Sequence, residues 1–311
     1  MGLIEQAAQR LEQLRRAGIE PGNPVPADPP VPAPAAPNDP GPGLQRADRP
    51  APAQAPAQAR RVTIDLARLA AAGVVTPGEP HSRIAHEMRV LKRPLLAAAF
   101  PEKGPAIARA NLLIVTSSVP GEGKTFLSLN LAMSIAAEID RKVLLVDADV
   151  ARPTVPTLLG VFEERGLLDV IAGTMRPEEA ILRTNVERLS YLPSGRPRPH
   201  AFEMLASESM AVLLEELASR YPDRMVVFDS PPLLSTTEAR MLAARMGQVV
   251  FVVRAESTLQ RDVKAALATI EECPIKLMVL NGARSHGLEG YGYGYGYGYG
   301  FDGSQAGPPK A

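Results

Sequence analysis

The sequence contains no tryptophan and only one cysteine, Cys273, among its 311 residues. A lone cysteine excludes a disulfide framework, and the four histidines, at positions 81, 86, 200 and 286, lack the spacing of metal ligands. The 34 basic residues are balanced by 34 acidic ones. This balance predicts no overall electrostatic attraction to nucleic acid or to an anionic membrane.

Long apolar segments are also missing. No run approaches the roughly 18 apolar residues that a transmembrane helix needs, and the first residues lack the apolar core of a signal peptide. We therefore expect a cytoplasmic protein.

Large apolar side chains are almost absent from residues 21–56, which hold a large share of the 31 prolines. Such a composition cannot bury enough surface to offset the entropy lost on folding. We therefore expect a Pro/Ala-rich linker over 19–79 and one folded core over 80–285. Before the linker, residues 1–18 form an amphipathic helical pattern, which favours a helix that docks on another protein. Its apolar positions are Leu3, Ile4, Ala7, Leu11 and Leu14.

Five of the seven tyrosines lie in the alternating segment GYGYGYGYGYG, at 290–300. The interleaved glycines weaken any strand there through backbone entropy and leave one face with nothing to pack. We expect residues 286–311 to form a flexible tail. The five tyrosines are Tyr291, Tyr293, Tyr295, Tyr297 and Tyr299.

Short apolar runs alternate with amphipathic helical patterns through the folded core. The runs are typical of strands buried on both faces and cover 112–117, 142–149, 189–193, 225–230, 248–255 and 276–283. The helical patterns include 125–138, 208–220 and 257–272. This alternation predicts an α/β fold in which helices cover both faces of a mostly parallel sheet.

The first predicted strand leads into SVPGEGKTF, at 118–126. Its glycines permit tight turns that aim backbone N–H groups at a phosphate, and Lys124 would reach the β- and γ-phosphates of ATP. The Thr125 hydroxyl would contact Mg²⁺ where the next helix begins. Ser118 replaces the usual first glycine, but the context still predicts a P-loop NTPase fold of the ParA/MinD-like type. The expected nucleotide contacts are Pro120, Gly121, Glu122, Gly123, Lys124, Thr125 and Phe126.

Acidic residues end two of the predicted strands. Asp229, in FDSPP, is placed to hold Mg²⁺ and to sense the γ-phosphate. Asp147 and Asp149, in VDADVARP, end another strand, and Arg152 follows them. A helix cap or a loop turn would explain either motif without function. However, simple ATP hydrolysis does not need a second acidic motif, whereas transfer to a hydroxyl needs a general base, so the pair indicates phosphoryl transfer.

With these motifs in this order, the chain resembles the bacterial tyrosine kinases of exopolysaccharide synthesis. The resemblance rests on PGEGKT, VDADVARP, FDSPP and the tyrosine cluster, and it spans residues 80–301. The N-terminal helix and HEMRVLKRPLL, at 86–96, are similar to the exosortase-associated branch of that family.

The resemblance implies an ATP-dependent autokinase that phosphorylates its own tail tyrosines in trans. In that role Lys124 would stabilise the transferred charge and Asp147 would accept the tyrosine proton. By analogy with the fold, Asn281 would contact adenine. The implied ligands of Mg²⁺ are Thr125, Asp149 and Asp229.

The resemblance also implies self-association, possibly as a ring, through residues 82–93. The family motif there is Glu-x-x-Arg-x-x-Arg, whereas the same frame here gives His86, Arg89 and Lys92. Two further departures are Ala151, where relatives carry arginine, and Glu238, where they often carry aspartate. The implied contact residues are Glu87, Arg89, Lys92 and Arg93.

Relatives act with a membrane polysaccharide co-polymerase of the chain-length-determinant type, and a cognate tyrosine phosphatase reverses the modification. By resemblance we expect such partners, a location peripheral to the inner membrane through the co-polymerase, control of exopolysaccharide polymerisation and export, and no nucleic acid. Two rivals stay open. A ParA/MinD-type ATPase would carry a lysine where this chain has Val119. A nucleotide-gated scaffold would bind ATP without kinase activity.

Overall fold

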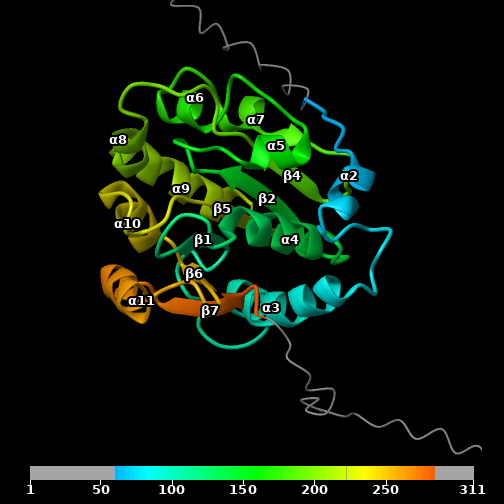
Figure 1. Cartoon of the computed structure of the whole chain (residues 1–311). Helices are drawn as coiled ribbons and strands as arrows, with labels where there is room; N and C mark the ends of the chain where they lie inside the picture. The colour runs from blue at the N-terminus through cyan, green and yellow to red at the C-terminus, as the bar shows by residue number, and fades with distance from the viewer. Residues whose placement is uncertain (1–59, 222, 284–311) are drawn as a thin grey trace, which may run out of the picture. The chain divides into compact units, whose positions relative to one another are not determined.

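The computed structural model describes residues 60–221 and 223–283, which all lie within the unit Gln54–Ala311. At the centre is a seven-stranded sheet with the order β3-β4-β2-β5-β1-β6-β7 (Figure 1). Neighbouring strands are parallel except β3 and β4, so the expected mostly parallel sheet is confirmed. The strands are β1 (Leu112–Ser117), β2 (Lys142–Asp147), β3 (Leu182–Arg183), β4 (Leu189–Leu192), β5 (Arg224–Asp229), β6 (Gln248–Arg254) and β7 (Ile275–Asn281).

Helices cover both faces of this sheet (Figure 1). The first face carries α2 (Leu66–Ala71), α3 (Arg83–Ala99), α4 (Lys124–Ala136) and α5 (Val155–Leu159). The second carries α6 (Leu167–Ile171), α7 (Pro177–Ala180), α8 (Ala201–Ala206), α9 (Glu208–Arg220), α10 (Thr237–Ala244), α11 (Gln260–Leu267) and the 3₁₀ turn η1 (Ala268–Ile270).

The two helical layers explain why the strand sequences are continuously apolar. Successive side chains of a strand point to opposite faces. In β1, Leu113 and Val115 pack toward α4, whereas Leu112 and Ile114 pack into the core on the other face. Since β1, β2 and β5 are parallel neighbours, their carboxyl ends meet at one edge, where such folds bind ligands.

The last strand, β7, departs from the expectation of burial on both faces. It is the end strand of the sheet, and its residues alternate between half-buried and exposed. Met278 and Leu280 are 55% and 62% exposed. The apolar run at 276–283 therefore forms a strand as expected, but one face of that strand is exposed.

The expected linker boundary at residue 79 is wrong, because residues 60–79 pack on the core. This segment contains α2, and Ile64, Leu69 and Val74 are buried against the α4 face of the sheet. The N–H of Val75 donates to Asn130 Oδ1 at 2.8 Å, which fixes the segment to α4. Within α2, Leu66 and Leu69 are three residues apart and so share one face that can be buried.

Two predicted elements, the N-terminal helix (1–18) and the tyrosine tail (286–311), lie outside the described residues. Within the described ranges, no helix combines the length and the apolar character that crossing a membrane requires.

Candidate active site

The glycine loop at 118–123 connects β1 to α4 at the carboxyl edge of the sheet. Gly121 and Gly123 have φ angles of +84° and +97°, in the left-handed region that other residues rarely adopt. The loop borders a cavity of about 470 Å³. Six of the expected nucleotide contacts line it: Pro120, Gly121, Gly123, Lys124, Thr125 and Phe126.

The carboxylate of Asp229 joins the end of β5 to the start of α4. Its two oxygens accept hydrogen bonds from Thr125 Oγ1 at 2.7 Å and from Ser128 Oγ at 2.9 Å. The Thr125 hydroxyl in turn accepts a hydrogen bond from Thr154 Oγ1 at 2.8 Å. The structure thus brings together the predicted pair Thr125 and Asp229, and it adds two hydroxyl groups that the motifs did not indicate.

These oxygens suit Mg²⁺, which prefers hard oxygen ligands and keeps few protein contacts when it also binds phosphates. Among the described residues, no group of three or more His, Cys, Asp and Glu side chains is arranged to hold a metal alone. Thr125, Asp229 and Asp149 would therefore hold Mg²⁺ together with the phosphate oxygens of a nucleotide rather than as a closed metal site.

Burial perturbs the charged groups of this site. Lys124, the first residue of α4, is 7% exposed; burial lowers the pKa of its ammonium group, while Asp229 and Asp149 act in the opposite direction. Asp229 is completely buried, which raises the pKa of its carboxyl group to about 6 against the hydrogen bonds from Thr125 and Ser128. Perturbed groups beside a cavity are typical of a functional site.

Asp147 and Asp149 occupy different environments. Asp149 lines the cavity, and burial raises the pKa of its carboxyl group. Asp147 is fully buried, and burial, followed by the charges of Asp229 and Asp149, raises its pKa well above the ordinary value. Among the described residues, no side chain donates to either carboxylate oxygen of Asp147; the backbone N–H of Asp149 lies near enough to act against the rise in its pKa. A buried carboxylate without a side-chain partner needs an explanation beyond packing.

Glu122 and Asn281, both expected to contact the nucleotide, do not line the cavity. Glu122 is 2% exposed, and its backbone carbonyl accepts a hydrogen bond from Asn281 Nδ2 at 2.9 Å. The structure thus gives the amide of Asn281 a partner in the loop itself, and its contact with adenine stays a prediction. Sequence spacing could not show this contact, because it joins residues 159 positions apart.

Several cavity residues were not identified from the sequence. Thr154 follows the second acidic motif, Phe202 lies on α8, and Ser235 and Thr236 follow FDSPP. The signal available for the last two was their position just after an acidic strand end, where ligand-binding loops of parallel sheets lie. No local pattern indicates Phe202, because α8 reaches the cavity only through the tertiary fold.

The residues expected to mediate self-association lie on α3, but they do not share one surface. Glu87 and Arg93 are exposed, and Arg89 is half-buried, with Nη1 donating to the Pro80 carbonyl at 2.6 Å. Lys92 is 3% exposed; it donates to the Ser134 carbonyl and pairs with Glu138, both at 2.6 Å. The expectation that Lys92 forms a subunit contact is therefore wrong.

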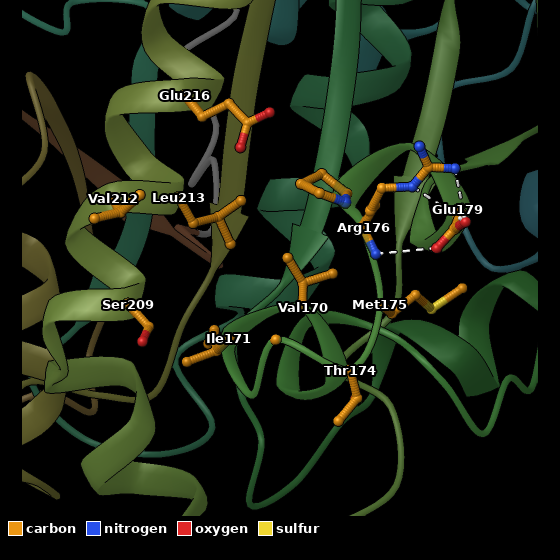
Figure 2. A pocket seen from close by; sticks show the side chains of 12 residues that line it. Val170, Ile171, Thr174, Met175, Arg176, Glu179, Ser209, Val212, Leu213 and Glu216 are labelled. Carbon is orange, nitrogen blue, oxygen red and sulfur yellow. Dashed lines mark hydrogen bonds and ion pairs between the residues drawn. The ribbon is translucent and has the colours of Figure 1, made fainter. Parts of the chain in front are cut away.

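A second cavity, of about 510 Å³, lies between α9 and the segment that connects α6 to α7 (Figure 2). Val170, Ile171 and Leu213 supply much of its wall. Its charged side chains include the pair Arg176 and Glu179, which bond to each other across the rim. This cavity is similar in size to the one at the glycine loop, but it lacks that loop and its buried lysine. The lining residues therefore favour the cavity at the glycine loop as the active site.

A family model described as an AAA domain matches residues 112–277. The tyrosine-protein kinase YwqD of Bacillus subtilis is 31% identical over 222 residues, which cover 70% of this chain and 90% of YwqD. The tyrosine-protein kinase wzc of Salmonella typhimurium is 31% identical over 188 residues, which cover 59% of this chain but only 26% of wzc. The similarity thus spans nearly all of one relative and about a quarter of the other.

Solved structures agree with this similarity. The kinase domain of the Escherichia coli tyrosine kinase ETK is 30% identical with a TM-score of 0.53, over 66% of this chain and 86% of that domain. The chimerical protein CapA2B2 is 26% identical with a TM-score of 0.57, over 70% of this chain and 93% of that one.

Proposed function

Because the chain belongs to the family of bacterial tyrosine-protein kinases, we propose that it transfers the γ-phosphoryl group of ATP to tyrosine hydroxyls. The observation that carries the proposal is the cluster of Lys124, Thr125 and Asp229 at the glycine loop. These residues come from two elements, α4 and β5, and a direct hydrogen bond joins Thr125 to Asp229. Such a cluster places a cation and metal-binding oxygens where phosphate charge develops.

The phosphates would lie against the backbone N–H groups of the loop and the N-terminus of α4, where the helix dipole favours negative charge. Lys124 would neutralise the charge on the transferred group. Thr125, Asp229 and Asp149 would hold Mg²⁺, which would supply positive charge to offset that of the phosphates. Thr154, bonded to Thr125, would fix the direction of that hydroxyl.

We assign the proton acceptor to Asp147 and the cavity-side metal contact to Asp149. Asp147 has a raised pKa and no side-chain donor among the described residues, so its carboxylate can accept a proton as a general base does. Because Asp147 is fully buried in this structure, the assignment requires that the segment after β2 moves when nucleotide and tyrosine bind. Catalytic contacts often tighten only in the substrate complex.

The substrate that the sequence supplies is its own tail, with Tyr291, Tyr293, Tyr295, Tyr297 and Tyr299. The tail follows β7, whose carboxyl end lies beside the glycine loop through the Asn281 contact. We propose that these tyrosines enter the active site of a neighbouring subunit. Glu87, Arg89 and Arg93 on α3 remain the proposed subunit contacts.

The family relationship extends the proposal to biology. From the resemblance of the sequence motifs, we propose that a membrane polysaccharide co-polymerase recruits and activates the chain, that a tyrosine phosphatase reverses the reaction, and that the cycle controls exopolysaccharide polymerisation or export. In this proposal the protein works in the cytoplasm at the inner membrane, where the co-polymerase holds it.

Replacing Lys124 with methionine tests the proposal. The full-length chain and Lys124→Met would be incubated with MgATP, and tyrosine phosphorylation would be followed with an anti-phosphotyrosine antibody and mass spectrometry. The matched control is Lys142→Met. Lys142 begins β2, at the end of the strand away from Asp147, and forms an exposed ion pair with Asp223. We expect phosphorylation to be lost in Lys124→Met and retained in the control.

Two other outcomes would contradict the kinase proposal. ATP hydrolysis by the unmodified chain, with no phosphotyrosine even when a co-polymerase segment is present, would identify an ATPase of the ParA/MinD type. Nucleotide binding with neither hydrolysis nor phosphotyrosine would identify a nucleotide-gated scaffold.

A further inference from the structure

The side chain of Glu122 lies in the glycine loop but does not line the cavity. Its carboxylate instead forms hydrogen bonds within the loop and with the segment that follows β6. Glu122 is 2% exposed. Its Oε2 atom accepts a hydrogen bond from the N–H of Val119 at 2.7 Å, so the carboxylate spans the turn of the loop. Its Oε1 atom accepts a hydrogen bond from the Thr258 hydroxyl. Both oxygens therefore have donors, and neither faces the proposed phosphate site.

The groups that hold Glu122 come from the ends of β6 and β7. Thr258 Oγ1 accepts a hydrogen bond from the N–H of Arg254, the last residue of β6, at 3.1 Å. Asn281, the last residue of β7, donates through Nδ2 to the Glu122 carbonyl, and its backbone carbonyl accepts a hydrogen bond from the N–H of Ala255 at 2.9 Å. The loop is thus bonded to the ends of two strands besides the elements β1 and α4 that it connects.

The contact with Asn281 is close as well as bonded. A Cβ atom built on Gly123 would lie 2.0 Å from Asn281 Nδ2 and 3.3 Å from its Cγ. A side chain at position 123 would therefore displace the amide, in addition to being strained at a φ of +97°.

We propose that Glu122 is a positioning residue, whose carboxylate holds the glycine loop in its phosphate-binding shape by bonding the Val119 N–H and Thr258. Asn281 supports the same loop separately, through the backbone carbonyl of residue 122. The inference rests on the proposed binding of ATP at this loop. A loop already fixed by three hydrogen bonds loses less entropy when a phosphate binds, so the bonds add affinity without touching the ligand. Since the chain continues from Asn281 toward Tyr291, the loop and the tyrosine segment also share this anchor.

The proposal predicts how strongly two variants at position 122 bind MgADP relative to the parent. Glu122→Ala removes both side-chain contacts. Glu122→Gln keeps an acceptor for the Val119 N–H and offers an N–H to Thr258, whose hydroxyl can turn to accept it. We expect the Kd for MgADP, measured by calorimetry on the full chain, to rise about tenfold in the alanine variant, a loss of about 1.4 kcal/mol. The glutamine variant should stay within about threefold of the parent.

The matched control is Glu256→Gln, which removes a charge from an exposed glutamate two residues before Thr258. Its Kd should not change. An unchanged Kd in Glu122→Ala would overturn the proposal, and so would a Glu122→Gln variant as weak as the alanine one, since the charge and not the hydrogen bonds would then matter. A fall in binding stoichiometry at constant Kd would also overturn it, because it indicates partial misfolding.

A second measurement needs no nucleotide and separates this proposal from the kinase assignment. Hydrogen exchange of the amides at 119–125 should be faster in Glu122→Ala and in Asn281→Ala than in the parent. Exchange in β1 should be the same in all three proteins. Equal exchange of the loop in parent and variants would refute the positioning role even if the protein proved to be a tyrosine kinase. Faster exchange would support that role even if no phosphotyrosine formed.

Discussion

Asp147 and Asp229 lie opposite each other on the neighbouring parallel strands β2 and β5. Both carboxylates are fully buried, but among the described residues only Asp229 has side-chain hydrogen-bond donors, Thr125 and Ser128. Two buried acids so placed disfavour each other's ionisation. The nucleotide-free protein thus keeps an electrostatically unfavourable pair at the point where we place Mg²⁺ and the proton acceptor.

The first prediction is that Asp147→Asn makes the nucleotide-free protein more stable and the kinase inactive. The substitution keeps the shape of the side chain and removes a charge that is costly to bury. We expect a gain of about 1 kcal/mol in the free energy of unfolding at pH 8, measured with urea in the presence of EDTA. Phosphorylation of the tail should fall at least a hundredfold, which is the usual scale for loss of a general base.

The gain in the free energy of unfolding from Asp147→Asn should depend on pH. Burial raises the pKa of Asp147 well above its ordinary value of 3.8, so the folded protein holds this proton more tightly than the unfolded chain does. Raising the pH above about 4 therefore destabilises the folded parent protein, until Asp147 itself ionises. Asparagine does not titrate, so the difference between variant and parent should be larger at pH 8 than at pH 5. A difference that is equal at the two pH values, or larger at pH 5, would contradict the account.

The second prediction separates two neighbouring cations on α3. Lys92→Met removes the buried partner of Glu138 and a bond to the Ser134 carbonyl, and we expect it to lower the free energy of unfolding by about 2 kcal/mol. The full cost of breaking a buried pair is not expected, because Glu138 is 24% exposed and Arg93 lies 3.8 Å from it.

The matched control is Arg93→Met, whose arginine side chain is 69% exposed. Its stability should change by less than about 0.5 kcal/mol. If α3 forms the subunit contact, this variant should instead lower the assembly size measured by sedimentation. Loss of assembly in Lys92→Met with unchanged stability would show that the lysine acts at an interface after all.

The contrast between Lys92 and Arg93 shows what sequence could and could not provide. The sheet and the glycine loop follow from local patterns, since apolar runs and a glycine-rich turn determine their own structure. The approach of Thr125 to Asp229 follows from the position of both motifs at the carboxyl ends of predicted parallel strands. Burial of Lys92 depends on α4, and the contact of Asn281 depends on the order of β6 and β7. The order of residues within one segment does not contain this information.

The segment 60–79 also shows a limit of prediction from sequence, here for the boundary of the folded unit. Its proline-rich neighbourhood favoured a linker, yet bonds to distant residues fix it in place. The N–H of Ile64 donates to Asn185 Oδ1 at 2.8 Å, and the backbone of Arg61 forms an isolated parallel β-bridge with that of Arg183. Composition describes a stretch as a whole, whereas these few polar contacts decide where the folded unit begins.

The third prediction concerns activation. We expect the isolated chain to phosphorylate its tail slowly, and a peptide from the cytoplasmic end of its co-polymerase to accelerate the reaction at least tenfold. The reason is that Asp147 is buried away from the cavity, so a partner that moves the segment after β2 would complete the site. The measurement is the initial rate of phosphotyrosine formation, with a scrambled peptide as control. Full activity of the chain alone, unchanged by the peptide, would count against it.

The fourth prediction follows from the charge of the tail. Each phosphotyrosine carries about −1.5 to −2 near neutral pH, so five would add roughly −8 to −10. The unmodified chain has a formal net charge of zero. Phosphorylation within an assembly would therefore place many like charges close together and weaken the contacts that allowed the transfer.

We expect the unphosphorylated protein, or a variant with all five tail tyrosines changed to phenylalanine, to form larger assemblies than the phosphorylated protein at low ionic strength. Salt should reduce the difference, because exposed charges are screened over about 10 Å at 0.1 M. The loss should be graded with the number of phosphates, since the repeat makes the five positions nearly equivalent. Sedimentation of both forms at low and high salt measures this. Equal sizes, or dependence on one particular tyrosine, would show that the tail does not release the assembly through its charge.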